Sequence, residues 1–222
     1  MSVQPRLKAP ARRANIVAAA LDAFASGGYG ATGMGDVARL SGVTRAVLYD
    51  HFASKKALFL AVLEEQRATF LGFIAARITG EGSKSERMLA TTEAVFHFAE
   101  RYPNAWRMLF VNATHGDPDI DAAWNDVAVS LNHAVTRLLA DDLRTADIDP
   151  DDQRAALLVE MLIGALTRAV EWRRKHGGLT RAEAVDTAMD LLWSGLAATA
   201  SYQPEAGARS DTKPPPAAGS RR

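Results

Sequence analysis

Five side chains that can bind a polyanion lie between positions 44 and 55: Thr44, Arg45, Tyr49, His51 and Lys55. An Arg guanidinium can fork onto the acceptor edge of guanine, whereas a Tyr hydroxyl or a Lys ammonium suits a phosphate oxygen. Thr44 can also accept backbone N–H groups at the start of a helix. The chemistry that these residues predict is therefore noncovalent recognition of double-stranded DNA.

The elements that would position these side chains can be read from the same stretch. The residue types favour a short helix over 34–40 with Gly33 as a weak N-cap, and Gly42 can take the positive φ that ends a helix abruptly. Thr44 then caps a second helix that buries Val47 or Leu48 together with Phe52. Two short helices joined by a tight turn form a helix-turn-helix, whose second helix lies in the major groove.

The distribution of charge supports this interpretation. The first sixty residues hold eight Lys or Arg and three Asp, a net charge of +5, whereas the whole chain balances 26 basic against 26 acidic residues. The remainder therefore carries −5. This separation of charge suits a protein with a basic end that binds a polyanion and a larger acidic part that is repelled by it. An ordinary helical hairpin with solvated charges is the alternative.

A wider set of residues between about positions 12 and 64 follows a recognisable order: Arg13, Ala20, Phe24, Gly28-Tyr29, Ala38, Gly42-Val43, Leu48-Tyr49, His51-Phe52 and Ser54-Lys55. In this order the chain resembles the TetR family of transcriptional regulators. The resemblance implies an N-terminal three-helix DNA-binding domain and a helical ligand-binding and dimerisation domain.

The resemblance also assigns contacts residue by residue. It implies DNA contacts at Thr44, Arg45, Tyr49, His51 and Lys55, with Ala46 and Val47 against bases or the sugar edge. Two positions depart from the family pattern. Gly33 stands where the family often has Thr or Ser, which leaves the neighbouring Thr32 as a substitute hydroxyl, and Ala46 stands where the family often has Gly, which bears on base preference.

The rest of the chain has helical rather than alternating periodicity, so we expect an all-α protein of about nine helices. The expected helices cover 11–26, 34–40, a segment that begins after the Thr44 cap, 54–78, 83–101, 103–112, 118–143, 150–176 and 180–201. We expect a loose basic arm at 1–10, a DNA-binding domain at 11–53, a ligand-binding and dimerisation domain at 54–202 and a disordered tail at 203–222. The long helix over 54–78 would join the two domains rigidly.

The last two expected helices carry more apolar residues than one intramolecular core requires. The stripes include Leu158, Leu162 and Leu166 on the first helix and Leu191, Leu192 and Gly195 on the second. Their excess predicts packing against a second copy, as in the family that the chain resembles. A homodimer would address a palindromic operator with half-sites about 34–36 Å apart. A thick monomeric core is the alternative.

Large flexible and aromatic residues between the fourth and eighth expected helices suggest a ligand pocket. Polar groups in the same helices could orient a mainly apolar effector. The candidate lining residues are Phe70, Phe73, Phe96, His97, Trp106, Phe110, Trp124, Glu160 and Met161. For any single one of them, core packing is the better explanation.

Several classes of function are disfavoured by what the sequence lacks. There is no Cys, no run of eighteen apolar residues and no signal-peptide core, so we expect a cytoplasmic protein without a membrane partner. No catalytic or cofactor motif is present. A metal at His97, His115 and Asp117 is an alternative, as is a DNA-binding protein without a small effector. The sequence therefore predicts no cofactor, and a repressor released by an unidentified hydrophobic effector, although activation would leave no mark in it.

Overall fold

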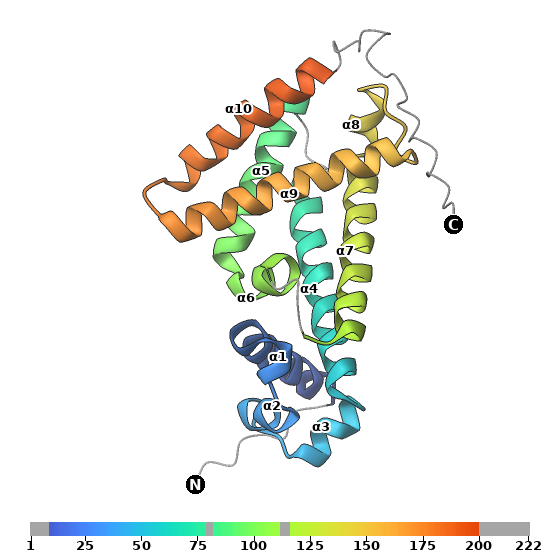
Figure 1. The fold of residues 1–222 in the computed structure, drawn as a ribbon, viewed down its shortest axis with the longest axis vertical. Helices are drawn as coiled ribbons and strands as arrows, with labels where there is room; N and C mark the ends of the chain where they lie inside the picture. The colour runs from blue at the N-terminus through green and yellow to red at the C-terminus, as the bar shows by residue number, and fades with distance from the viewer. Residues whose placement is uncertain (1–8, 79–81, 112–115, 200–222) are drawn as a thin grey trace, which may run out of the picture.

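The computed structural model describes residues 9–78, 82–111 and 116–199, and within them every regular element is helical (Figure 1). The prediction of an all-α fold is confirmed. The helices are α1 (Ala9–Ala31), α2 (Met34–Leu40), α3 (Arg45–His51), α4 (Lys55–Ile78), α5 (Lys84–Arg101), α6 (Pro103–Trp106), the π-helical turn η1 (Arg107–Val111), α7 (Pro118–Leu138), α8 (Ala140–Arg144), α9 (Gln153–His176) and α10 (Arg181–Thr199). The predicted disordered tail lies outside the described residues.

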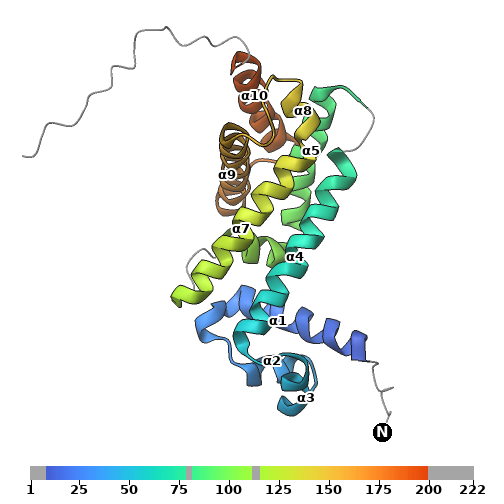
Figure 2. The same ribbon diagram turned by 90° about the vertical axis from the view of Figure 1, so that its right-hand side faces the viewer.

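The molecule is elongated, with α1, α2 and α3 at one end and α5, α8, α9 and α10 towards the other (Figure 1). We call the group of α1 to α3 the head and the group of α5 to α10 the body. Helix α4 runs from the head into the body beside α7, and the view turned by 90° shows the same arrangement (Figure 2). One continuous helix therefore connects the two ends.

Helix α4 contributes to two separate hydrophobic cores. Its first half places Leu58, Phe59, Val62 and Leu63 in the head core, all at most 1% exposed. Its second half places Phe70 and Ile74 in the body core. The head core also includes Met108 from η1 and Ile120 from α7, so the head packs directly against the body.

Helix α1 is longer than the sequence predicts at both ends. It begins at Ala9, so two residues of the predicted loose arm are helical, which Pro10 tolerates because the first turn of a helix needs no bonded N–H groups. Helical hydrogen bonding also continues past the predicted end at position 26. The axis bends there at Gly28, whose φ of 75° and ψ of 167° only glycine adopts without strain.

The predicted helix over 103–112 is a short α-helix followed by a wider π-helical turn. The Met108 carbonyl in that turn accepts a hydrogen bond of 2.9 Å from the Trp124 indole of α7. A π-turn leaves carbonyls with altered partners, and this one is satisfied by a neighbouring helix. Position 112 itself lies outside the described residues.

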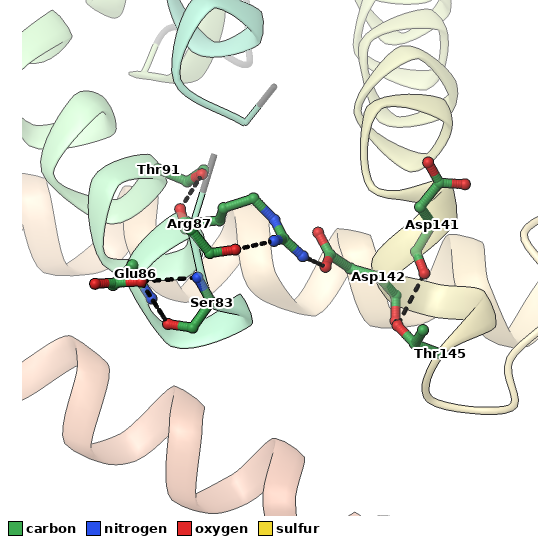
Figure 3. A network of polar contacts seen from close by, with 8 residues as sticks. Ser83, Glu86, Arg87, Thr91, Asp141, Asp142 and Thr145 are labelled. Atoms are coloured by element: carbon green, nitrogen blue, oxygen red, sulfur yellow. Dashed lines mark hydrogen bonds and ion pairs between the residues drawn. The ribbon is translucent and has the colours of Figure 1, made fainter. Parts of the chain in front are cut away.

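The predicted helix over 118–143 is two helices, because Leu139 leaves helical geometry with φ −93° and ψ 6°. The following helix α8 is tied to the start of α5 by an ion pair between Asp142 and Arg87 (Figure 3). In the same corner Ser83 caps α5, and the Glu86 carboxylate accepts from the Ser83 N–H at 2.7 Å. At the break the chain turns towards α5, and the ion pair stabilises this direction.

Candidate nucleic-acid interface

Helix α2 begins with a cap made by its own first turn. The Gly33 carbonyl accepts from the Asp36 N–H at 3.0 Å, and the Asp36 carboxylate accepts from the Gly33 N–H at 3.2 Å. Glycine has no side chain to complete the reciprocal cap, so Asp36 compensates on one side only. The prediction of a helix from 34 to 40 with Gly33 as N-cap is confirmed.

The turn between α2 and α3 is formed by a left-handed glycine and held by two hydrogen bonds. Gly42 has a φ of 68°, and the Val43 N–H reaches back to the Ala38 carbonyl at 3.0 Å. From α1, the Asn15 amide donates to the Ser41 carbonyl at 2.7 Å. These bonds fix the angle between the two short helices, as the helix-turn-helix interpretation requires.

Helix α3 is capped by the Thr44 hydroxyl, which accepts from the Val47 N–H at 3.3 Å. Leu48 is fully buried and Phe52 is 5% exposed, so these two residues anchor the helix to the head. The opposite side presents Arg45, Ala46 and Tyr49, with Tyr49 half exposed. Helix α3 lies at the tip of the molecule (Figure 1), so the exposed residues Arg45, Ala46 and Tyr49 are accessible there.

Lys55, at the start of α4, lies against the head. Its ammonium is 4.2 Å from the centre of the Tyr29 ring and 3.4 Å from the Gly30 carbonyl oxygen, to which it donates a hydrogen bond. Burial, with a smaller contribution from the Asp117 carboxylate, raises the pKa of the Tyr29 hydroxyl. The Lys55 side chain therefore packs on the face of the Tyr29 ring, next to the exposed side of α3.

Three other predicted contacts differ in accessibility. Val47 and His51 are half-buried at the sides of α3. Thr32 is only 6% exposed, and its hydroxyl donates to the carbonyls of Ala23 and Gly28 at 3.1 and 2.8 Å. The expectation that Thr32 offers a substitute hydroxyl to phosphate therefore does not hold, because the hydroxyl closes the bend at the end of α1.

These features define a helix-turn-helix protein, and comparisons with known proteins connect this class to the regulation of transcription. The sequence pattern of the family described as "Bacterial regulatory proteins, tetR family" matches residues 16–62. The HTH-type transcriptional activator FasR of Mycolicibacterium smegmatis is 28% identical over 192 residues, which cover 86% of this chain and 85% of FasR.

Solved structures share the fold along most of the chain. A TetR-like transcriptional regulator from Rhodococcus sp. RHA1 is 23% identical, with a TM-score of 0.68 over 86% of this chain and 99% of that one. The regulator FadR from Bacillus subtilis, solved in complex with stearoyl-CoA, is 16% identical, with a TM-score of 0.68 over 82% of this chain and 98% of FadR. Residues 16–62 thus carry the DNA-binding domain of the TetR family of transcriptional regulators, and the likeness to the solved structures extends the shared fold along most of the chain.

The predicted ligand residues do not form one group. Phe70, Phe73 and Phe110 gather with Trp106 and Phe98 between α4, α5 and η1, where Phe70 meets Phe110 edge to face at 5.1 Å between ring centres. His97 is exposed beside Phe73, with ring centres 5.7 Å apart. Trp124 belongs instead to the head core. The aromatic core of the body thus contains only some of the residues predicted to line a ligand pocket.

Two of the remaining candidates lie away from that core. Glu160 is exposed and accepts a hydrogen bond of 2.8 Å from the Asn132 amide of α7. Met161 is 62% exposed on the outer side of α9, so it does not face the aromatic core as predicted. A pocket of about 240 Å³ between α5, α6 and α9 is lined by Phe96, Ala99, Glu100, Pro103, Val170, Arg173 and Arg174.

The face of α9 that lacks an intramolecular partner differs from the one predicted. Leu166 is 5% exposed and belongs to the body core with Val159 and Val170, so its assignment to a dimer interface is wrong for geometric reasons. The exposed apolar stripe lies on the opposite side of α9 at Leu157, Met161 and Trp172, which are 60%, 62% and 49% exposed. Both sides of this helix are apolar, so the sequence alone does not distinguish Leu157 and Trp172 from the residues of the buried side.

The other predicted interface residues are divided. Leu158, Leu162 and Leu192 are half-buried, whereas Leu191 on α10 is 71% exposed. Gly195 lies in the part of α10 whose side chains are not described. Helices α9 and α10 lie side by side on one flank of the body in both views (Figures 1 and 2).

Two other expectations concern metals and membranes. Among the described residues, no three His, Asp or Glu side chains group so as to hold a metal ion, while His115 lies outside that part of the chain. No described helix is both long enough and apolar enough to span a bilayer.

Proposed function

We propose that this chain is a homodimeric regulator that binds a palindromic operator through α3 and the start of α4. The observation that carries the proposal is the outward face of α3, where Arg45, Ala46 and Tyr49 are exposed while Leu48 on the other side is fully buried. Arg45 and Ala46 would face base edges, and Tyr49 and Lys55 would contact phosphates, with Thr44, Val47 and His51 completing the surface.

A homodimer is supported by the exposed stripe on α9. A helix surface with Leu157, Met161 and Trp172 in water is costly, and an apolar patch of this kind marks a contact with another protein. Leu191 of the neighbouring α10 is also exposed, at 71%. Pairing of this surface with its own copy would create a four-helix interface and a two-fold axis. The two heads would then reach half-sites about one helical turn apart.

The proposed effector is amphiphilic, with a long acyl chain such as that of a fatty acyl-CoA. The structural relative FadR was solved with stearoyl-CoA, and another relative is described as a fatty acid degradation regulator. In this chain, the aromatic core around Phe70, Phe73 and Phe110 offers apolar surfaces beside α4. A ligand that prefers one position of α4 would change the spacing of the two heads and hence operator affinity.

The sign of regulation depends on where the operator lies. A dimer that overlaps a promoter obstructs polymerase. We therefore propose repression for such a site, as the sequence predicts. The mycobacterial relative is named an activator. An operator upstream of the promoter would allow activation by this chain as well. Transcription in vitro from one promoter, with the operator placed at either position, measures it directly.

The first test is selection of bound sequences from a random double-stranded DNA pool, with the wild-type protein and with Arg45→Ala. We expect a palindrome whose preferred base at one symmetric position is relaxed in the variant. A wild-type selection without a motif, or a motif without two-fold symmetry, would contradict the proposed dimeric operator binding.

The second test titrates stearoyl-CoA into the protein bound to the selected operator, with hexanoyl-CoA and free CoA as controls for chain length and head group. We expect a change in operator affinity with the long chain alone. By linkage, the operator must change the affinity for stearoyl-CoA by the same factor. Equal responses to all three compounds would exclude recognition of the acyl chain.

A further inference from the structure

Gly35 leaves a gap in the surface of α2 that the side chain of Arg45 fills. A Cβ atom built on Gly35 would overlap the Nη2 of Arg45 and would lie 2.9 Å from its Nε and 3.0 Å from its Cζ. Such separations are closer than a side-chain carbon tolerates. Any residue other than glycine at position 35 would therefore move the guanidinium.

The position of the Arg45 side chain is open to it because Gly35 has no side chain. Within the described part of the chain its side chain forms no hydrogen bond or ion pair. The neighbouring carboxylate of Asp36 is engaged elsewhere, with the Gly33 N–H at 3.2 Å and with Arg39 at 3.7 Å. The direction of the Arg45 side chain consequently depends on the room that Gly35 leaves.

The fold of α2 does not itself call for glycine at this position. The backbone φ of Gly35 lies outside the positive range that favours glycine, unlike that of Gly42 at 68°. Inside a helix glycine is less favourable than alanine by about 1 kcal/mol. The three atoms nearest to its missing side chain all belong to the mobile end of Arg45, which can move, so we expect alanine to cost the fold little.

We propose that Gly35 is a positioning residue for operator recognition, which sets the direction from which Arg45 addresses DNA. The inference rests on the proposed function, in which Arg45 contacts the operator. A long Arg side chain has many rotamers, and the missing side chain of Gly35 admits the one in which the guanidinium lies against α2. With Gly35 the guanidinium lies along α2, and with a larger residue it would start from another direction.

The experiment is a double-mutant cycle with Gly35→Ala, Arg45→Ala and the double variant on the selected operator. Affinity is measured by fluorescence anisotropy. We expect Gly35→Ala to weaken binding by about fivefold or more, within the range of a single Arg–base contact. In the Arg45→Ala background, the same substitution should change affinity less than about twofold, because its target is gone.

Controls separate positioning from stability. Gly72→Ala adds a methyl group to α4 at a site with no atom within 4 Å, so it should retain wild-type operator affinity. The Gly35→Ala protein should melt at or above the wild-type temperature. Gly35→Leu, with a larger side chain, should weaken binding at least as much as Gly35→Ala.

Three results would overturn the inference: wild-type operator affinity of Gly35→Ala, a loss for Gly35→Ala of equal size in both backgrounds, or a lowered melting temperature that accounts for the loss. Failure of the proposed function looks different. In that case Arg45→Ala alone would retain the affinity and the sequence preference of the wild type.

Discussion

Trp106 of α6 donates its indole N–H to the Glu171 carboxylate of α9 at 2.8 Å, while its ring is 1% exposed in the body core. This pair joins the short helix below the aromatic core to the helix that carries the proposed dimer surface. The same Glu171 carboxylate oxygen lies 3.4 Å from the Nε of Arg174 on its own helix, so Glu171 also forms an ion pair.

Replacement of Trp106 by Ala should lower the free energy of unfolding by about 3–5 kcal/mol, because a large buried ring is lost. Trp106→Phe keeps most of the apolar packing and removes the hydrogen bond, while Arg174 still accompanies Glu171, so its cost should be about 1–2 kcal/mol. Urea unfolding at a fixed protein concentration measures both. Equal losses for the two variants would mean that the hydrogen bond outweighs burial of the ring.

Removal of the Lys55 ammonium should reduce the salt dependence of operator binding. A cation that neutralises one phosphate contributes about 0.9 to the slope of log K against log salt concentration, so Lys55→Ala should flatten the slope by about 1. The measurement is operator affinity between low and moderate salt. Lys84→Ala, an exposed lysine at the far end of the body, is the matched control and should leave the slope unchanged. A wild-type slope for Lys55→Ala would remove Lys55 from the proposed phosphate contacts.

Tyr49→Phe should weaken operator binding without changing its salt dependence. The half-exposed Tyr49 would lose only a neutral hydroxyl, and no charge that displaces counterions. The loss of one hydrogen bond should be about 0.5–1.5 kcal/mol and of similar size on specific and random DNA. If the loss appeared on the specific operator alone, Tyr49 would be assigned to a base instead of a phosphate.

Met161→Glu should convert the dimer into a monomer and weaken operator binding through loss of the second head. The side chain is 62% exposed, so a carboxylate there is harmless to the folded monomer, but a charge buried between two copies is costly. Sedimentation velocity measures the change in mass. Leu40→Glu, at a residue that is 52% exposed in the head, is the control and should remain dimeric. A Met161→Glu dimer of wild-type strength would place the interface elsewhere.

Glu100→Gln should reduce the loss of stability in acid. Burial raises the pKa of Glu100, but hydrogen bonds of 2.7 Å from both Arg181 and Arg173 outweigh it, so the pKa falls below its ordinary value of 4.5. The stabilising effect is complete above pH 4.5 and disappears as the pH falls through the lowered pKa. Between pH 6 and pH 3 the melting temperature should decrease less in Glu100→Gln than in the wild type. Glu93→Gln, on the exposed side of the same helix, should follow the wild-type profile.

Much of the head could be predicted because local chemistry determines it. Gly42 needs its positive φ, Thr44 caps the next helix, and Leu48 and Phe52 are the apolar anchors, all within one stretch of sequence. The same holds for the start of α5, where Ser83 and Glu86 form a capping pair three residues apart. The family resemblance drawn from these positions is confirmed.

Other features depend on contacts between distant residues. The break at Leu139 has no Gly or Pro to signal it and is explained by the pairing of Asp142 with Arg87, 55 positions away in the sequence. The two apolar sides of α9 look alike in sequence, so only tertiary packing shows that Leu166 faces inward and Met161 outward. The crowding of Arg45 at Gly35 likewise arises from the angle between α2 and α3.

The head core is completed by residues from the body, with Met108 and Ile120 at 1% and 0% exposure against side chains of α1 and α4. A head cut away from the body would lack these two side chains and would have a cavity in its apolar core, so the head depends on the body for a complete core. Local unfolding of the body would consequently release the DNA-binding end from its support. Substitutions far from α3 can in this way lower operator occupancy by reducing the population of intact heads, without altering a single contact to DNA.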